Sequence, residues 1–435
     1  MKKRILCVVL LVAIAALCLV ALSSCNRNSS VDFFDYSADD LGLVGKLVYV
    51  MHKWIKNYGW TVVVFTLFLK TAMLPLEFWQ RYSSRKSSLK MQKIQPLVEA
   101  IDKRYGANTQ RANEEKQKLY KKQGYSMTSM CLPMILSMVI FFVMFGGLRN
   151  YSTYSNITSF QNLSQTYHET YVEQIIQNND LVSLIESKEG FVDVVKNYGT
   201  AKAAYETDRT ADSAKGLLNA QTDVISGAKQ VNAKLCEEYE QVALKAVQDY
   251  YKDHHETWLW IQNVWQPDTW ATIMQPYSGG SFGGGGFSSS GIDLKGYKGI
   301  EPTYNLIRNA VLETGGYGNH GNWNGLMILP FMSIGLSFLS MFISQRIERK
   351  NRNGESVQQN QQQAATNKTM MIMMPLMMAW FGFIYTGAFA IYMVINYMYS
   401  ILTSLALRVP VEKAVLKALD KDEKKNNSSK ASYMR

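Results

Sequence analysis

The chain has 435 residues, of which 47% are hydrophobic, and its formal net charge at pH 7 is +11. The mean hydropathy is nevertheless slightly negative, so the apolar residues must be concentrated in blocks. This composition indicates a membrane protein that also has a large water-exposed part. The five cysteines exclude a disulfide framework, because only Cys236 lies in the long polar region.

The first apolar block predicts a lipoprotein-type signal peptide at residues 1–24. The stretch from Ile5 to Leu22 follows three basic residues and ends in small residues before Cys25. Such a basic start, apolar centre and small-residue cut are typical of a secretory signal. The cysteine after the cut resembles a bacterial lipobox, so Cys25 is expected to be the acylated first residue of the mature chain. A plain signal peptide or a retained anchor is the alternative.

Residues 25–57 are expected to lie outside the membrane and to contain an interfacial helix. The sequence LGLVGKLVYVMHKWIKNYG places apolar residues at helical spacing with lysines between them. These apolar positions are Leu43, Leu47, Val50, Met51, Trp54 and Ile55. The pattern is typical of an amphipathic helix that lies in the plane of the outer interface.

Four further hydrophobic blocks predict five transmembrane helices. The last block, residues 369–407, is about twice the ~20 residues that span a bilayer. It is divided at Gly387, because Tyr385-Thr386-Gly387 can form a tight turn. The predicted spans are residues 58–78, 126–148, 326–345, 369–386 and 388–407.

Lys70 is the one charge inside the apolar run from Trp60 to Glu77. An ammonium in the interior of a span costs roughly 2.5 to 3.5 kcal/mol, so such a residue is a functional-site candidate by default. The alternative is a lysine that extends its ammonium to the lipid headgroups.

Positive charge predicts the orientation of the chain. Lys and Arg outnumber Asp and Glu in residues 79–125, 346–368 and 408–435, and short segments of this kind stay in the cytoplasm. Residues 149–325 are net acidic and are expected outside, together with the mature N-terminus. The net charge of +11 is therefore interpreted as a topological asymmetry rather than a nucleic-acid footprint, and no DNA partner is expected.

Residues 79–125 predict a basic cytoplasmic hairpin of two helices, separated at Gly106-Ala107-Asn108. Its Lys and Arg side chains would attract anionic lipid heads, ribosomal RNA or an acidic nascent chain, since all three carry negative charge. A solvated face that only fixes the topology is the alternative.

Residues 149–325 are predicted to form a large extracytoplasmic loop domain with helical stretches. Four tryptophans between residues 258 and 270 suit a membrane interface. The glycine-rich residues 279–291 are interpreted as a flexible connector. His254-His255-Glu256 lacks a metal-binding spacing and is interpreted as helix surface, so no metal site and no cofactor are predicted.

Several motifs follow one another in a fixed order along the chain. They are Tyr58-Gly59-Trp60, Lys70 five residues before Pro75, SSLKMQKIQPLVEAIDKRYG, LYKKQG with Cys131-Leu132-Pro133, WLWIQNVWQPD, MMIMMPLMMAWFGF and TGAFAIYMVINYMYSI. In this ordered set the chain resembles the YidC/Oxa/Alb family of membrane protein insertases, in its bacterial lipoprotein-type subtype. The resemblance covers all five predicted spans, whereas residues 150–256 match none of its motifs.

The resemblance implies an all-α, polytopic fold whose five helices form a groove open to the cytoplasm and to lipid. It places one cation in that groove, an arginine in the family and Lys70 here. A guanidinium stays charged, whereas a desolvated ammonium can lose its proton, so Lys70 requires a wet groove. Further candidate groove residues are Ser137, where the family usually has glutamine, and Tyr392 and Asn396, which share a helix face. Helix packing is the alternative for each.

The function implied is that of an insertase and chaperone, not an enzyme. Short polar tails of nascent membrane proteins would cross through the groove, and apolar segments would enter lipid, without nucleotide hydrolysis. The expected partners are nascent membrane proteins and the lipid bilayer, with the ribosome and a Sec translocon as further candidates. The expected location is the bacterial cell membrane, with the N-terminus outside and the C-terminus cytoplasmic. A channel or secondary transporter for an anionic solute is the alternative, although no inverted repeat supports it.

Overall fold

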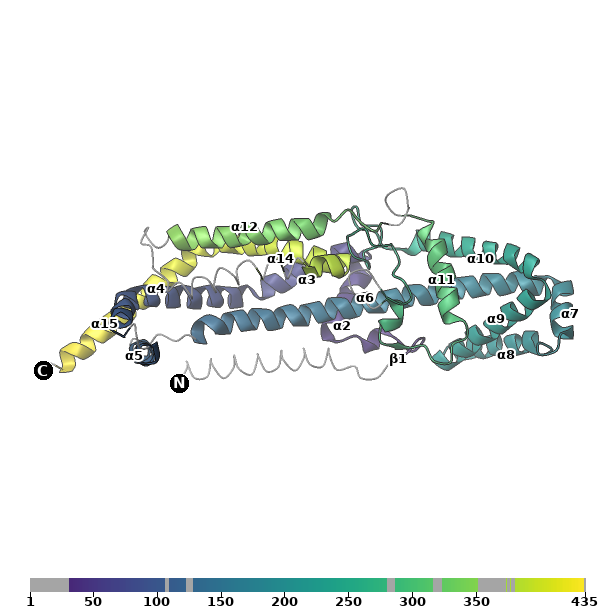
Figure 1. Cartoon of the computed structure of the whole chain (residues 1–435), viewed down its shortest axis with the longest axis horizontal. Helices are drawn as coiled ribbons and strands as arrows, with labels where there is room; N and C mark the ends of the chain where they lie inside the picture. Colours follow the sequence, from purple (N-terminus) through teal and green to yellow (C-terminus); the bar gives the residue numbers. More distant parts are fainter. Residues whose placement is uncertain are drawn as a thin grey trace.

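The computed structural model shows an elongated, almost entirely helical molecule built from two parts (Figure 1). Apolar helices form one part, a second helical bundle forms the other, and the long helix α6 (Thr128–Gln177) runs through both. The arrangement confirms the all-α, polytopic fold class. The structure describes residues 31–105, 109–122, 128–279, 286–315, 323–350, 373, 376 and 380–433.

Several predicted features lie outside these described residues. They are the signal peptide with Cys25, the hairpin turn at 106–108, most of the loop at 346–368, half of the fourth span at 369–386, and residues 280–285 of the glycine-rich connector. These features stay predictions.

The apolar part contains helices that the sequence predicts as spans. α12 (Ile328–Lys350) and α14 (Gly387–Ala406) are each long and apolar enough to cross a membrane, and they pack side by side. α3 (Tyr58–Ala72) packs on α14 and forms a pair with α4 (Leu74–Tyr105) that is bent by 54°. Among the described residues, two single helices are thus long and apolar enough to be spans, and the bent pair of α3 and α4 can form a third.

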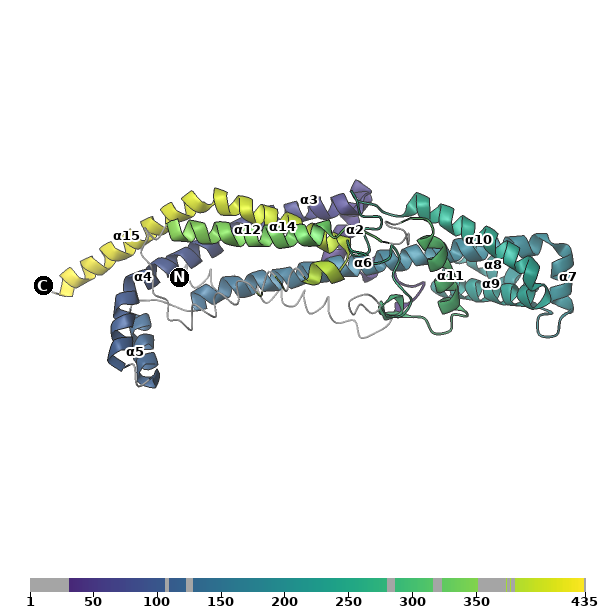
Figure 2. The same ribbon diagram turned by 45° about the horizontal axis from the view of Figure 1, so that its top comes forward.

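The bend between α3 and α4 falls at Met73, and Pro75 lies in the first turn of α4. Proline is tolerated in a first helical turn, because N–H groups there have no intrahelical partner. α4 then runs without a break past residue 79, where the sequence pattern divides the first span from the hairpin. α5 (Thr109–Lys122) lies beside the far end of α4 (Figure 2), and an ion pair joins Lys116 to Asp102.

α2 (Leu43–Ile55) forms where the amphipathic pattern predicts a helix. One face packs on α6, and Gly147 permits this close approach because a Cβ there would lie 2.2 Å from Val44 Cγ1. The other face leaves large apolar side chains accessible, with Trp54 84% and Leu43 69% exposed. An exposed apolar face of this kind suits a lipid surface.

The second part of the molecule has its own hydrophobic core. Its helices besides α6 are α7 (Asn179–Ser187), α8 (Val194–Thr207), α9 (Ala211–Val231), α10 (Ala233–His254) and α11 (Ile300–Leu312). A parallel pair of two-residue strands, β1 (Val31–Asp32) and β2 (Ile292–Asp293), ties the start of the described chain to this part. Short 3-10 helices lie at Ala38–Asp40 and Phe287–Ser289.

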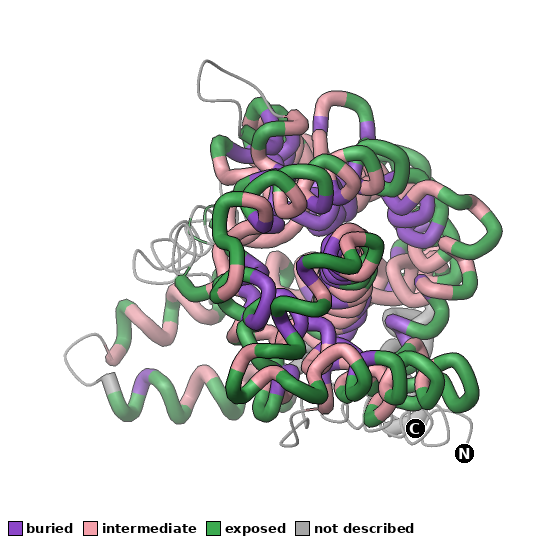
Figure 3. The backbone as a smooth tube through the Cα atoms, turned by 90° about the vertical axis from the view of Figure 1, so that its right-hand side faces the viewer, coloured by how far each residue is buried: buried purple, intermediate pink, exposed green. Residues whose placement is uncertain are grey.

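Aromatic rings fill the centre of this second core. Phe160, Phe287 and Tyr304 contact one another with ring centroids 4.6 to 4.9 Å apart, a spacing typical of favourable aromatic pairs. A view along the long axis shows buried positions on the inward faces of the helices (Figure 3). Cys236 is a buried free thiol in the same core.

His168 of α6 is also buried there. Its Nδ1–H donates to the carbonyl of Ser164 at 2.7 Å, and burial lowers the pKa of the imidazole from 6.5 to about 4. Between these two values the unfolded chain binds a proton that the folded chain does not bind. Acid therefore favours unfolding in this interval.

We expect His168 to lower the free energy of unfolding by about 3 kcal/mol as the pH drops from 7 to 4. Urea unfolding of the full chain in detergent, repeated at several pH values, measures this dependence. His168→Phe cannot titrate and should unfold with a shallower dependence on pH. Identical pH dependences for the two proteins would contradict a buried, neutral histidine.

Candidate functional site

Lys70 lies in the last turn of α3 and pairs with Glu77 in the first turn of α4. The distance from Lys70 Nζ to Glu77 Oε1 is 3.6 Å, and the side chains are 19% and 17% exposed. Seven residues correspond to about two helical turns, which brings both side chains to one side of the bent pair. The sequence interpretation of Lys70 as a solitary charge is therefore incomplete, since its ammonium has a carboxylate partner.

Lys70 pairs with only one of the two carboxylate oxygens of Glu77. Its second oxygen, Oε2, is buried and has no hydrogen-bond partner among the described residues. Buried polar atoms are nearly always paired in folded proteins. This oxygen therefore remains able to accept a further hydrogen bond beside the buried cation.

Arg81 continues the polar line one turn further along α4. Its Nη1 donates to Ser404 Oγ at 2.9 Å, and its Nη2 donates to Thr403 Oγ1 at 3.2 Å. Both acceptors belong to the last turn of α14. Lys70, Glu77 and Arg81 thus form a charged line that we call the Lys70–Arg81 line, running from inside the apolar part toward the end of α14.

Arg85 fixes the next helix to this end of the molecule. Its Nε and Nη2 donate to the two carboxylate oxygens of Glu412 at 2.8 and 3.0 Å. Glu412 belongs to α15 (Arg408–Tyr433), which follows α14 after Leu407 and packs on α4. Paired arginine–carboxylate bonds of this type are directional and strong.

Tyr392 and Asn396, the candidate groove residues on α14, do not share the ion pair of Lys70. Tyr392 of α14 is buried in the apolar core, with its ring 6.1 Å from that of Phe389, and Asn396 is half-buried one turn further on. Among the described side chains, no hydrogen bond or ion pair joins Lys70 to either residue. Ser137 lies on α6, and its side chain is outside the described part of the chain.

The segment 256–273 packs against the opposite end of the apolar part. Asp268 is completely buried and accepts hydrogen bonds from Leu326 N at 3.0 Å and Leu329 N at 2.8 Å. Its second oxygen also accepts from Trp260 Nε1 at 3.2 Å. A carboxylate at this position caps the N-terminal end of α12 and interacts favourably with the helix dipole.

Asn324 and two glycines hold the same segment in place. Asn324 donates through Nδ2 to the carbonyls of Asn263 and Pro267, and it accepts from Asn263 N at 2.7 Å. Gly325 cannot carry a side chain, because a Cβ would lie 2.0 Å from Asp268 Oδ1. Gly387 N donates to Gln266 O at 2.8 Å, which ties the start of α14 to the segment.

Two of the four tryptophans are buried in protein, which differs from the predicted membrane interface. Trp265 stacks on Tyr58 with centroids 4.0 Å apart, and Trp258 packs so closely on Gly59 that a Cβ there would lie 2.2 Å away. Trp270 is 59% exposed and is the one that matches the predicted interface best. The tryptophans of this motif therefore pack in the protein core as well as lying at the surface.

Glu256 lies beyond the end of α10 and is not simply helix surface. Its Oε1 is 2.9 Å from His52 Nε2, and its Oε2 accepts from Tyr58 N at 2.6 Å. It therefore joins the second part of the molecule to α2 and to the start of α3.

Sequence reasoning missed Glu77, Arg81 and Asp268. Glu77 offered a usable signal, because it follows Lys70 by two helical turns and is the next charge in the chain. The partners of Arg81, and the two backbone N–H groups of α12's start that donate to Asp268, are more than 50 residues away in sequence. No local pattern could have shown those contacts.

Helices able to cross a membrane, with charges buried among them, define an integral helical membrane protein. The family model described as 60Kd inner membrane protein matches residues 50–187 and 242–413, well over half of the chain. The chain therefore belongs to this family, the YidC/Oxa family, and the resemblance inferred from the motifs is confirmed. The unmatched residues 188–241 cover α8, α9 and the start of α10.

Curated relatives share shorter stretches with this chain. "Membrane protein insertase YidC" of Caldanaerobacter subterraneus is 37% identical over 112 residues, which cover 26% of this chain and 52% of the relative. The proteins of the same name from Endomicrobium trichonymphae and Campylobacter jejuni are 34% and 36% identical, over 25% and 23% of this chain and 21% and 18% of theirs. The chain thus spans about half or less of the length of these relatives. No solved structure matches it.

Proposed function

We propose that this chain is a membrane protein insertase, which moves short polar tails of nascent membrane proteins across the bilayer and releases apolar segments into lipid. The observation that carries the proposal is the Lys70–Arg81 line, held between apolar helices in a member of this family. Charges at membrane depth are costly and mark a route for a polar substrate. The proposed transfer uses no nucleotide and no enzymatic step.

The proposed topology has five spans, with the mature N-terminus outside and the C-terminus in the cytoplasm. α12, α14 and the bent pair of α3 and α4 support three of these spans. The apolar start of α6 and residues 369–386 are proposed as the other two. Positively charged flanks support a cytoplasmic hairpin and tail, and Cys25 is proposed as the lipidated first residue. In this orientation the segment 256–273 closes the outer end.

The ion pair with Glu77 explains how the Lys70 cation can lie at membrane depth before a substrate binds. A paired ammonium and carboxylate cost less there than either charge alone. We propose that the carboxylate of an entering acidic tail replaces Glu77 at Lys70, and that Glu77 Oε2 accepts an N–H of the tail. The cation then stabilises the tail partway across. Burial of about 20 apolar substrate residues in lipid supplies the driving force.

The remaining parts of the chain have proposed roles around this step. Ser137, Tyr392 and Asn396 are proposed to line the groove, although Tyr392 is buried in the core. α5 and the end of α4 are proposed as the cytoplasmic platform that receives nascent chains. The ribosome and a Sec translocon are proposed partners of that platform.

Reconstitution of the full chain tests the proposal. A single-span test protein with an acidic N-terminal tail should insert into liposomes that contain the chain, without added nucleotide, and not into liposomes that lack it. Protease protection of the tail measures insertion. If the chain instead releases a trapped anionic solute from the liposomes and leaves the test protein outside, it is a transporter and the insertase proposal fails.

A further inference from the structure

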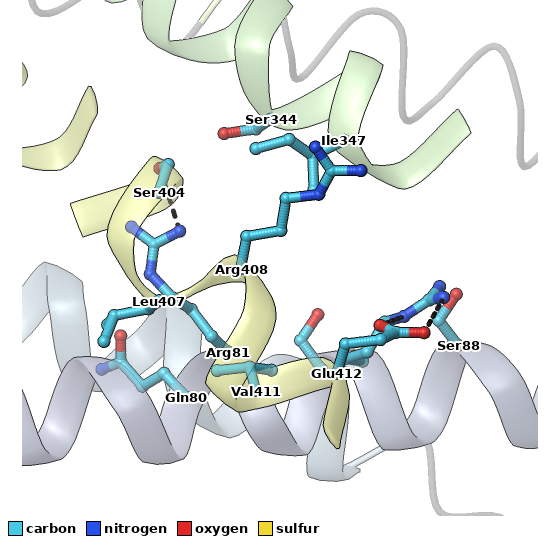
Figure 4. Close-up of a pocket in the computed structure, with 12 residues that line it drawn as sticks. Gln80, Arg81, Ser88, Ser344, Ile347, Ser404, Leu407, Arg408, Val411 and Glu412 are labelled. Carbon is cyan, nitrogen blue, oxygen red and sulfur yellow. Dashed lines mark hydrogen bonds and ion pairs between the residues drawn. The ribbon is translucent and has the colours of Figure 1, made fainter. Parts of the chain in front are cut away.

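A cavity of about 300 Å³ lies where α4, α12, α14 and α15 meet (Figure 4). Three arginines line it, Arg81, Arg85 and Arg408, together with the hydroxyls of serines from three of these helices. Figure 4 shows the Arg408 side chain extending from α15 toward Ser344 and Ile347 of α12. The cavity therefore gathers cationic and hydrogen-bonding groups from separate helices at one place.

The cavity lining carries more positive than negative charge, with three arginines and one glutamate. Glu412 is the only acidic residue among those that line it, and it is engaged by Arg85. Arg81 is bonded to hydroxyl groups of α14, which carry no charge. For Arg408, the described part of the chain provides no hydrogen bond or ion pair. Two arginines thus remain without a counter-charge in hydrogen-bond contact.

The position of the cavity suits the headgroup layer of a bilayer. Its residues lie just after the first predicted span on α4, at the end of the third span on α12, and at the end of the fifth span beside Leu407. Three spans therefore end at the same level. Leu405 and Val409, three residues before and one residue after Arg408, expose more than half of their surface. Exposed apolar side chains at this level can contact acyl chains.

We propose that this cavity binds the phosphate of an anionic phospholipid headgroup. Arg81 and Arg408 supply the positive charge, Ser344 and Ser404 supply hydroxyl groups, and the acyl chains lie against the apolar surface formed by Leu405 and Val409. Arginine suits a phosphate group because its planar donors match the phosphate oxygens. The lipid would fix the depth in the membrane at which α14 ends and α15 begins. This inference goes beyond the insertase proposal and does not depend on it.

Native mass spectrometry of the full chain in detergent tests the site, with phosphatidylglycerol and phosphatidylcholine as probes. The wild type should retain one phosphatidylglycerol more tightly than phosphatidylcholine. Arg408→Gln should weaken that retention about fivefold, since one arginine contributes about 1 kcal/mol to anionic lipid binding. Arg81→Gln combined with Arg408→Gln should weaken it further. Lys413→Gln combined with Lys417→Gln removes equal charge from exposed positions on the same helix and should leave retention unchanged.

Two results would overturn the assignment. Equal retention of phosphatidylglycerol by the double arginine variant and by the double lysine variant, which lose the same charge, would mean that general surface charge holds the lipid. Displacement of the lipid by millimolar inorganic phosphate would mean that the site takes free phosphate and not a lipid. Arg408 has no partner to lose within the described structure, so this variant should unfold at the wild-type temperature in lipid-free detergent. That measurement separates lost binding from lost folding.

Discussion

Replacing Lys70 by alanine should lower the insertion rate of an acidic-tailed test protein about 10- to 100-fold. The estimate follows from the loss of one interaction with a charged group, worth about 1.5 to 3 kcal/mol. Lys70→Arg keeps a cation at the same place and should restore most of the rate. The measurement is protease protection of the tail in liposomes, with acidic and uncharged tails compared. The uncharged tail should be affected least, because it has no carboxylate to stabilise.

The ion pair makes a control for folding necessary. Lys70→Ala leaves the Glu77 carboxylate buried without its partner, and such a change destabilises a protein in its own right. Lys70→Ala combined with Glu77→Gln removes both charges and should recover the thermal stability while insertion stays low. If this double variant inserts acidic tails at the wild-type rate, the cation is not needed and the proposed mechanism is wrong.

The candidate site could be predicted only in part from the sequence. Lys70 is predictable because a charge inside an apolar run stands out without any knowledge of its spatial neighbours. Its pairing with Glu77 depends on α3 and α4 remaining one bent unit across Met73, and periodicity does not fix such a bend. Tyr392 shares a helix face with Asn396, yet most of its surface is an aromatic ring, and burial of that ring in the core decides where it lies.

The fold was predicted best where apolar blocks are long. α12 and α14 follow directly from their hydropathy. α6 shows the limit of that approach, because its apolar start and its polar continuation into the second part are one unbroken helix. The pattern changes near Leu148 from an apolar block to an amphipathic one, and such a change predicts the end of the second span. The backbone can stay helical while the surroundings of the helix change from apolar to polar.

The buried cap of α12 should have the largest effect on stability. Asp268→Ala removes the acceptor for Leu326 N, Leu329 N and Trp260 Nε1. Unsatisfied buried donors cost about 1 to 3 kcal/mol each, and loss of a helix cap costs about 1 kcal/mol. We expect the free energy of unfolding to fall by about 3 to 5 kcal/mol, because part of this cost is relieved when water enters. Urea unfolding of the full chain in detergent measures the change.

Asp253→Ala is the matched control for this prediction, because Asp253 is an exposed carboxylate at the end of α10. Its replacement should change the free energy of unfolding by less than about 0.5 kcal/mol. Asp268→Asn should fall between the two, since its amide oxygen can still accept while its NH₂ group faces N–H donors. Equal stability of Asp268→Ala and Asp253→Ala would show that the closed end does not depend on this carboxylate. The order expected here instead makes Asp268 the residue through which the segment 256–273 holds the start of α12.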